Sequence, residues 1–321
     1  MSRRTLLGAN VTAFALLLAV VSPTPAFASA PPDETEELAT ISEMVNPDAA
    51  EVVAFAGDGE AVATDPGPGG PVAVESSGDT TIAFSLDGAA QPYLDVSVDQ
   101  SGTAEPVTVS DDGLAVAATT SEAAPHVVVS TTEQGTSIQA VLDSPAAGDE
   151  VRFDFGDAQV RLLDDGGAEV FETDAQAPGI ELVLATIETP WAFDANGAAV
   201  ETSFAVDGST LVQQVAVGAE TAYPVVADPY QYNGLRYPQI RWSWPETRAL
   251  NANKGNYAVA IATCAGIAAA SWAAAVFTGA VCAAQFVRWA NAIGNAYAAG
   301  KCFAVSFNFP GPNPSSYACR K

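Results

Sequence analysis

Short alternating segments, separated by turn dipeptides, fill residues 49–228 and limit the fold more than any other feature of the sequence. In each segment apolar and polar side chains alternate with a period of two, which is typical of a β-strand with one face in a core. The predicted strands are Glu51–Phe55, Thr80–Leu86, Tyr93–Val98, His126–Thr131, Thr136–Leu142, Glu150–Phe155, Gln159–Leu163 and Thr210–Val217.

Asx-Gly pairs separate these strands, and their glycines supply the positive φ that tight hairpin turns require. No long helical pattern interrupts the region. We therefore expect an acidic antiparallel β-sandwich, or two stacked β-units, over residues 49–228. The turn pairs are Asp58-Gly59, Asp87-Gly88, Asp112-Gly113, Asp165-Gly166, Asn196-Gly197 and Asp207-Gly208.

The sequence changes character after residue 228. Residues 229–245 are rich in proline and aromatic residues and are expected to form a linker. Pro245 can occupy an early helical position, and the Ala-rich residues 246–321 are expected to form a small helical domain. The fold class is therefore α+β, with a β-sandwich-like domain followed by a disulfide-bonded helical domain.

The last predicted helix is amphipathic. Gly300 follows it as a typical helix stop, and a strand is expected from Phe303 to Phe309. Residues at spacings of three and four lie on one face of this helix, as they do in a helix that packs against a core. These residues are Cys282, Phe286, Trp289, Ile293 and Tyr297.

An uncharged segment of 31 residues, 257–287, precedes that helix and has the length of a membrane span. Its composition argues for another structure, because it holds 13 Ala and no Leu. Ala is near neutral for membrane insertion, and small residues also allow two helices of a soluble protein to pack closely. We favour a soluble helical hairpin and keep membrane insertion as the alternative.

Charge is divided between the two regions. Residues 31–231 hold two arginines against 37 acidic residues, a net charge of -35, whereas residues 232–321 hold eight cations against Glu246 and have a net charge of +7. The pI of about 4.1 for the whole chain argues against a nucleic-acid binder. Opposite charges on one chain point instead to an interaction with a charged surface.

Four cysteines, all in the basic region, predict two disulfides in an exported chain. Three pairings are open, and we favour pairing neighbours along the chain. A four-cysteine zinc site is disfavoured because no Cys-x-x-Cys pair is present. The favoured disulfides are Cys264–Cys282 and Cys302–Cys319.

The N-terminus has the features of an export signal. Arg3 and Arg4 precede an apolar stretch of about eleven residues, which is too short to span a membrane of ~30 Å, and Ala26-Phe27-Ala28 is a cleavage signature. We expect a signal peptide over residues 1–28 that directs export through the Sec or the twin-arginine pathway. Residues 29–48 are expected to form a disordered acidic leader. The protein is therefore expected to be secreted, with association with the cell envelope as a further expectation.

Residues 180–321 resemble a group of uncharacterised exported actinobacterial proteins. In that group a β-rich module ends in a Tyr-Pro-Val-Val-Ala-Asp-Pro signature and precedes a variable C-terminal domain, here a Cys-containing Ala-rich helical one. The resemblance implies this order of domains and no known activity. It rests on Thr189-Pro190-Trp191-Ala192, Asp194-Ala195-Asn196-Gly197, Val206-Asp207-Gly208, Tyr223-Pro224-Val225-Val226-Ala227-Asp228-Pro229, Glu246-Thr247 and Gly300-Lys301-Cys302.

Serine and aspartate are abundant, but a catalytic base to partner them is scarce, and we expect no enzyme and no cofactor. His126 is the single histidine and so the one triad base available, and it lies at the start of a predicted strand, where a structural role is common. The chain has no Gly-x-Ser-x-Gly, phosphate-loop or His-Glu-x-x-His motif. A calcium site is disfavoured because the acidic cluster lacks the required loop order. That cluster consists of Asp154, Asp157, Asp164 and Asp165.

The sequence favours a secreted, non-enzymatic interaction protein. Its cationic helical region would act on an anionic membrane or cell-wall surface, with the acidic β-region as carrier and mask. A structural or adhesive envelope protein is the alternative, and a carboxylate-dependent hydrolase is less favoured. The candidate binding residues combine cations with aromatic rings near the start of the helical region: Arg236, Arg241, Trp242, Trp244 and Arg248.

Overall fold

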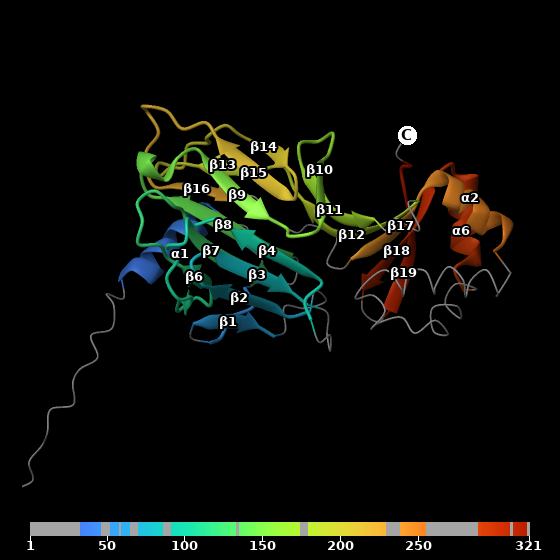
Figure 1. Cartoon of the computed structure of the whole chain (residues 1–321), viewed down its shortest axis with the longest axis horizontal. Coiled ribbons are helices and arrows are strands. Elements are labelled where there is room, and N and C mark those ends of the chain that lie inside the picture. The colour runs from blue at the N-terminus through green and yellow to red at the C-terminus, as the bar shows by residue number, and fades with distance from the viewer. Residues whose placement is uncertain are drawn as a thin grey trace, which may run out of the picture. The chain divides into compact units, whose positions relative to one another are not determined.

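Three antiparallel sheets make up most of the fold (Figure 1). The computed structural model describes residues 33–45, 52–57, 59–64, 70–85, 91–132, 135–173, 179–228, 238–254, 288–308 and 311–319. Residues Asp33–Lys321 group as one compact unit. Three α-helices accompany the sheets among the described residues: α1 (Asp33–Val45), α2 (Trp244–Ala252) and α6 (Ala290–Ala298). A β-rich protein with a small helical part is therefore confirmed.

The first two sheets pack around one large hydrophobic core, to which both contribute fully buried side chains such as Ile82 and Ile138. The seven-stranded sheet has the order β1 (Glu60–Ala63), β2 (Val72–Ser76), β3 (Thr80–Phe84), β4 (Leu94–Val98), β9 (Glu150–Asp154), β15 (Thr210–Val215) and β14 (Thr202–Asp207). The second sheet has the order β13 (Trp191–Phe193), β16 (Val225–Asp228), β8 (Gly135–Leu142), β7 (His126–Thr132), β6 (Ala115–Ala117) and β5 (Thr108–Val109).

Among the described residues, three of the Asx-Gly pairs lie in hairpin turns: Asp112-Gly113, Asp165-Gly166 and Asp207-Gly208. Asp207 pairs with Thr210 across the β14–β15 hairpin, which leaves Gly208 and Ser209 as the loop. Gly208 has φ +67°, a conformation that side chains with a Cβ rarely adopt. Most of the predicted strands are confirmed, but Glu51–Phe55 forms no strand within its described residues and contributes an isolated bridge from Val52 to Thr132.

A helix occupies part of the range expected to be disordered. Helix α1 buries Leu38, Ala39 and Ser42 against the second sheet, where it contacts β6, β7, β8 and β16. It covers an apolar patch that includes Val116 and Val128, which point away from the main core. The expectation of a disordered leader was wrong for residues 33–45 because this face of the sheet is apolar and requires a cover.

The third sheet joins the two regions that the sequence separated. Its order is β10 (Gln159–Leu162), β11 (Ala168–Thr173), β12 (Ile180–Ile187), β17 (Gln239–Trp242), β18 (Cys302–Asn308) and β19 (Gly311–Tyr317). The central pairing places Ile180 opposite Trp242 and Val183 opposite Gln239. Residues 239–242 were expected to lie in a linker, and they form an interior strand of this sheet instead. Residues 229–237 lie outside the described part of the chain.

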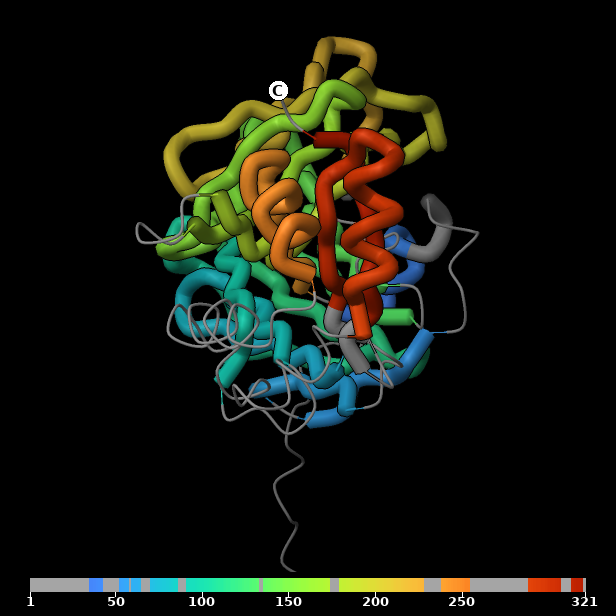
Figure 2. The backbone as a smooth tube through the Cα atoms, turned by 90° about the vertical axis from the view of Figure 1, so that its right-hand side faces the viewer, coloured from blue at the N-terminus to red at the C-terminus, as the bar shows by residue number. Residues whose placement is uncertain are grey.

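Helices α2 and α6 pack side by side on one face of the third sheet, as Figure 2 shows in orange and red. Between them and the sheet lie Trp242, Phe303, Trp289 and Ile293, all buried. The ring centroids of Trp242 and Phe303 are 5.1 Å apart. The buried indole and phenyl rings hold the helix pair on its sheet.

The end of α6 confirms the predicted stop. Gly300 has φ +66° and donates its N–H to the carbonyl of Tyr297, while Lys301 donates to the carbonyl of Ala296. These two bonds form the Schellman motif, in which a left-handed glycine satisfies the last carbonyls of a helix. The chain then turns directly into β18.

One predicted disulfide, Cys302–Cys319, joins the start of β18 to the chain just after β19. Cys264 and Cys282, the other predicted pair, lie outside the described residues, as do Phe286 and the uncharged segment 257–287. Among the helices that the structure describes, none has the length and hydropathy to cross a membrane.

Candidate binding surface

The five candidate binding residues divide into buried and exposed ones. Trp242 is only 1% exposed and belongs to the core under the helices, and Arg241 is 9% exposed. Trp244 is half-buried at the start of α2, and Arg248 is exposed one turn later. Arg236 lies outside the described residues. Among the described candidates, Trp244 and Arg248 therefore remain as surface contacts, whereas Arg241 and Trp242 hold the fold together.

Arg241 belongs to a charge network on the face of the third sheet opposite α2 and α6. Its guanidinium lies 2.6 Å from the carboxylate of Glu169, which also pairs with Arg161 at 2.9 Å. Arg161 makes a second pair with Glu181 at 2.7 Å. Residues from β10, β11, β12 and β17 are joined in this way. Glu169 is 4% exposed, and a carboxylate this deeply buried requires such partners.

Tyr317 on β19 closes the network at the C-terminal edge. Its ring lies 5.1 Å from the Arg241 guanidinium, and its hydroxyl donates to the carbonyl of Trp242 at 3.0 Å. Burial, and after it the negative charge of Glu181, raise the pKa of this hydroxyl to about 12. The Arg241 charge acts in the other direction. The network is structural, because its charges already satisfy one another.

Four described cations have no ion pair with any described residue: Arg248, Lys254, Arg288 and Lys301. All four are exposed, and all lie on α2, on α6 or at the ends of these helices. The other arginines of the described chain are paired: Arg152 with Asp207, Arg161 with two glutamates, and Arg241 with Glu169. The uncompensated positive charge of the described residues is therefore gathered on the helix pair.

Helices α2 and α6 contact each other through an aromatic pair at one place and a lysine side chain at another. Trp244 at the start of α2 stacks on Tyr297 near the end of α6, with ring centroids 5.3 Å apart and planes at 4°. Near the other end of α2, the Lys254 amino group lies only 2.9 Å from where a Cβ on Gly294 would be. The absence of a side chain on Gly294 leaves room for this amino group over α6. We call the exposed side of this helix pair the helix-pair surface. Its residues are Trp244, Arg248, Lys254, Arg288, Tyr297 and Lys301.

Glu246, the one acidic residue of the basic region, makes its contacts at the start of α2. Glu246 lies in the first turn of α2, where the helix dipole favours a negative charge. Its carboxylate accepts a hydrogen bond from the Ser243 hydroxyl, and it lies against Gly179, the residue before β12. Ser243 and Glu246 have the spacing of a capping box, which the sequence could have revealed. Glu246 therefore does not neutralise the cations further along the helices.

Part of the sequence that carries the resemblance has a structural role in this chain. Val225, Val226 and Ala227 form β16, which is buried between β13 and β8. Asp194, just after β13, accepts hydrogen bonds from the backbone N–H groups of Asn196, Ala198 and Ala222. These bonds, above all that from Ala198, hold the pKa of Asp194 below its usual value. The carboxylate thus ties the Asp194–Gly197 turn to the start of the Tyr-Pro-Val-Val segment.

His126 is a buried strand residue with two partners. Its Nε2 lies 2.8 Å from the Asp143 carboxylate, and its Nδ1 accepts a hydrogen bond from the Thr119 backbone N–H at 3.2 Å. Nδ1 therefore carries a lone pair, and the ring donates through Nε2. Both ring nitrogens are therefore occupied, and neither of these two described partners is a serine or a cysteine. The arrangement suits a structural histidine better than a triad base.

The acidic cluster weighed for calcium serves the turns of its own hairpins. Asp154 accepts from the Gly156 N–H and the Ser209 hydroxyl, and Asp165 accepts from the Gly167 N–H. Burial, and secondarily the negative charge of Asp157, raise the pKa of Glu172. Within the described ranges no three His, Cys, Asp or Glu side chains are grouped as metal ligands.

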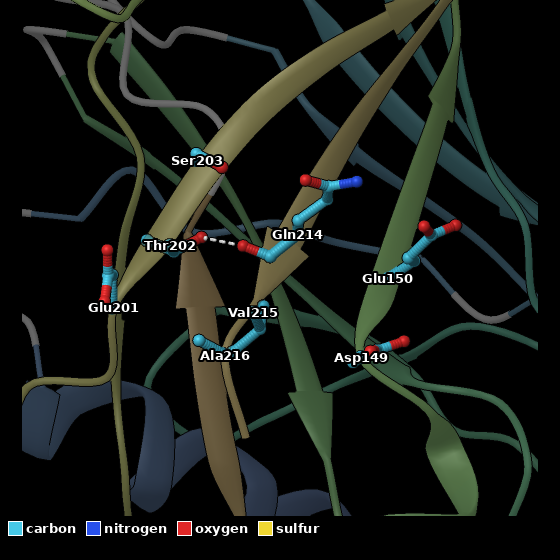
Figure 3. Close-up of a pocket in the computed structure, with 8 residues that line it drawn as sticks. All are labelled: Asp149, Glu150, Glu201, Thr202, Ser203, Gln214, Val215 and Ala216. Carbon is cyan, nitrogen blue, oxygen red and sulfur yellow. Dashed lines mark hydrogen bonds between the residues drawn. The ribbon is translucent and has the colours of Figure 1, made fainter. Parts of the chain in front are cut away.

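A shallow hollow of about 320 Å³ lies on the seven-stranded sheet (Figure 3). Asp149 and Glu150 line one side and Glu201 the opposite side, with Thr202 and Gln214 between them. Thr202 donates its hydroxyl to the Gln214 carbonyl at 2.7 Å. Glu150 lies 3.9 Å from Arg152. The hollow is polar and open, and its three carboxylates are exposed.

Comparison of the chain with protein-family models, with curated proteins and with solved structures finds no match.

Proposed function

We propose that this chain is an exported, non-enzymatic interaction protein that attaches to an anionic membrane or cell-envelope surface through the helix-pair surface. The observation that carries the proposal is the distribution of its cations. The described cations without a described carboxylate partner all lie on or beside α2 and α6, the two helices that the Trp244–Tyr297 stack joins. Exposed cations of this kind attract anionic surfaces at long range and are weakened by salt.

In this proposal the acidic β-region does not mask the cations of the helical region. Arg241 is the one cation of residues 238–319 that pairs with a described carboxylate of the β-region, and it is buried. The helix-pair surface keeps its positive charge in the full-length chain. The acidic region carries this surface on a shared sheet and keeps the whole protein soluble through its net negative charge.

The test uses the full mature chain, residues 29–321, and its sedimentation with vesicles of phosphatidylglycerol, with vesicles of phosphatidylcholine and with isolated cell-wall fragments. We expect binding to at least one anionic surface, weakening as salt is raised. Replacing Arg248, Lys254, Arg288 and Lys301 by glutamine should abolish this binding. Arg152→Gln is the matched control, since it removes an exposed cation from the β-region. Equal binding by the fourfold variant and the parent chain would refute the proposed surface.

A further inference from the structure

The spacing of the cations on the helix-pair surface points to the shape of its ligand. The Lys254 amino group lies over Gly294, Arg288 comes six residues before Gly294, and Lys301 comes seven residues after it. Arg288 lies just before α6 and Lys301 just after it, so the nine residues of α6, about 13 Å of helix, separate these two cations, and the Lys254 amino group lies beside the middle of the helix. The cations are therefore spread along α6 rather than converging on one point.

A row of separated cations suits a linear polyanion better than a single small anion. A small anion is held by several donors that converge on it in a pocket. Here the four cations are each exposed, on the helix pair or at its ends: Arg248, Lys254, Arg288 and Lys301. A chain with a negative charge on successive units can meet the cations one after another, each contact adding to the next.

The aromatic stack adds a second kind of contact. Trp244 and Tyr297 cover one another's inner ring faces, and Tyr297 remains 37% exposed. An exposed aromatic ring packs well against the C–H face of a sugar, with its hydroxyl left for hydrogen bonding. Arg248 lies one helical turn from Trp244, and Lys301 follows Tyr297 by four residues, so cations flank the exposed ring.

The same surface is poorly suited to entering a lipid bilayer. Interfacial helices bury several large apolar side chains below the headgroups. The exposed residues of α2 and α6 are mostly small or polar, such as Ala249, Ala252, Asn291 and Asn295. Of the large hydrophobic residues exposed in the described ranges, Leu162, Val206 and Tyr297, one alone lies on this surface.

We infer that the helix-pair surface binds a linear anionic glycan, a sugar chain that carries carboxylate or phosphate groups. The cations follow the charges of the chain, and the Tyr297 ring contacts one of its sugars. This inference rests on the proposed function and names the ligand class for the same surface.

The experiment measures binding of the full mature chain to four probes: alginate, inorganic polyphosphate, neutral dextran and phosphatidylglycerol vesicles. Alginate has charged sugars, polyphosphate has charge without sugars, and dextran has sugars without charge. We expect alginate to bind most tightly, polyphosphate more weakly, and dextran and the vesicles not measurably. Each of Lys254→Gln and Lys301→Gln should weaken alginate and polyphosphate alike and reduce the salt slope by about one. Arg152→Gln should change neither.

Tyr297 separates the sugar contact from the charge contact. Tyr297→Ala should weaken alginate binding about fivefold and leave polyphosphate unchanged, whereas Tyr297→Phe, which keeps the ring, should retain most of the alginate affinity. Binding to the vesicles but not to alginate would overturn the glycan inference and leave the proposed function intact. Equal affinity for polyphosphate and alginate, with no effect of Tyr297→Ala, would also overturn it. No binding to any anionic probe would overturn both.

Discussion

Asp194 shows how much one carboxylate contributes where two chain segments meet. Its Oδ1 accepts from Asn196 and Ala198, and its Oδ2 accepts from Ala222 at 3.3 Å. We expect Asp194→Ala to lower the urea midpoint more than Asp194→Asn, because an asparagine oxygen can still accept two of the three N–H groups. Circular dichroism at neutral pH measures both midpoints.

The same residue predicts a pH dependence with a definite sign. The pKa of Asp194 is lowered from 3.8 in the folded chain, so the unfolded chain binds the proton more readily. Its contribution to the free energy of unfolding is therefore present above about pH 4 and lost as the pH falls below that value. The difference in midpoint between the parent and Asp194→Ala should shrink toward pH 3. A constant difference across this range would exclude the carboxylate charge as its cause.

Tyr317 predicts the opposite dependence at high pH. Its pKa is raised from 10.0 to about 12, so above pH 10 the unfolded chain loses this proton while the folded chain retains it. The stabilisation from the protonated hydroxyl is complete below pH 10 and disappears as the pH rises to about 12. Tyr317→Phe should be less stable at neutral pH, having lost the bond to Trp242, and should lose less stability between pH 9 and pH 11.5. Urea titrations of both chains across this range provide the measurement.

At the scale of the elements, Glu169 on β11 is the carboxylate shared by Arg161 of β10 and Arg241 of β17. We expect Glu169→Gln to lower the free energy of unfolding by about 3–5 kcal/mol, because it leaves two arginines, one of them buried, without their common partner. Glu150→Gln on the exposed side of β9 is the matched control and should cost less than about 0.5 kcal/mol. Similar losses in the two variants would show that the network contributes little.

The elements that the sequence predicted well are those whose signals are local. The short segments between turn residues predict β7, β8 and β15. Gly208, in a turn pair, predicts a hairpin turn, and Gly300, after a helical pattern, predicts a helix end. Strand β17 was missed because its residues, Gln239–Trp242, follow a proline and lie among aromatic residues that resemble a linker. Its strand conformation comes from pairing with β12, about sixty residues earlier, and no local pattern reports such a pairing.

Helix α1 was missed for a related reason, although the sequence held an indirect sign of it. Val127, Val128 and Val129 are consecutive and all fully buried, so β7 is covered on both faces. A run of this kind in an antiparallel sheet requires a second cover, which Leu38 and Ala39 supply. Of the five candidate binding residues, Arg241 and Trp242 are buried parts of the fold, which a sequence pattern of cations and aromatic rings does not reveal.

At the scale of the whole molecule, the third sheet predicts that neither half is stable alone. Residues 29–228 on their own would leave β12 without β17, and an apolar strand edge without its partner promotes aggregation. We expect this fragment to elute as aggregates or to lack a cooperative unfolding transition, in contrast to residues 29–321. Size-exclusion chromatography and thermal unfolding of the two chains test this. A monomeric, cooperatively folded fragment would show that β12 tolerates a free edge.

The β12–β17 pairing also bears on how genes for such chains can recombine. A crossover after Asp228, where the composition changes, would separate Ile180–Val183 from the strand that hydrogen-bonds to it. A crossover before Ile180 would transfer β12 together with β17, β18 and the helix pair, at the expense of the β11–β12, β9–β15 and β8–β16 pairings. A new C-terminal region joined at Asp228 can therefore replace the present one only if it brings its own strand to that edge.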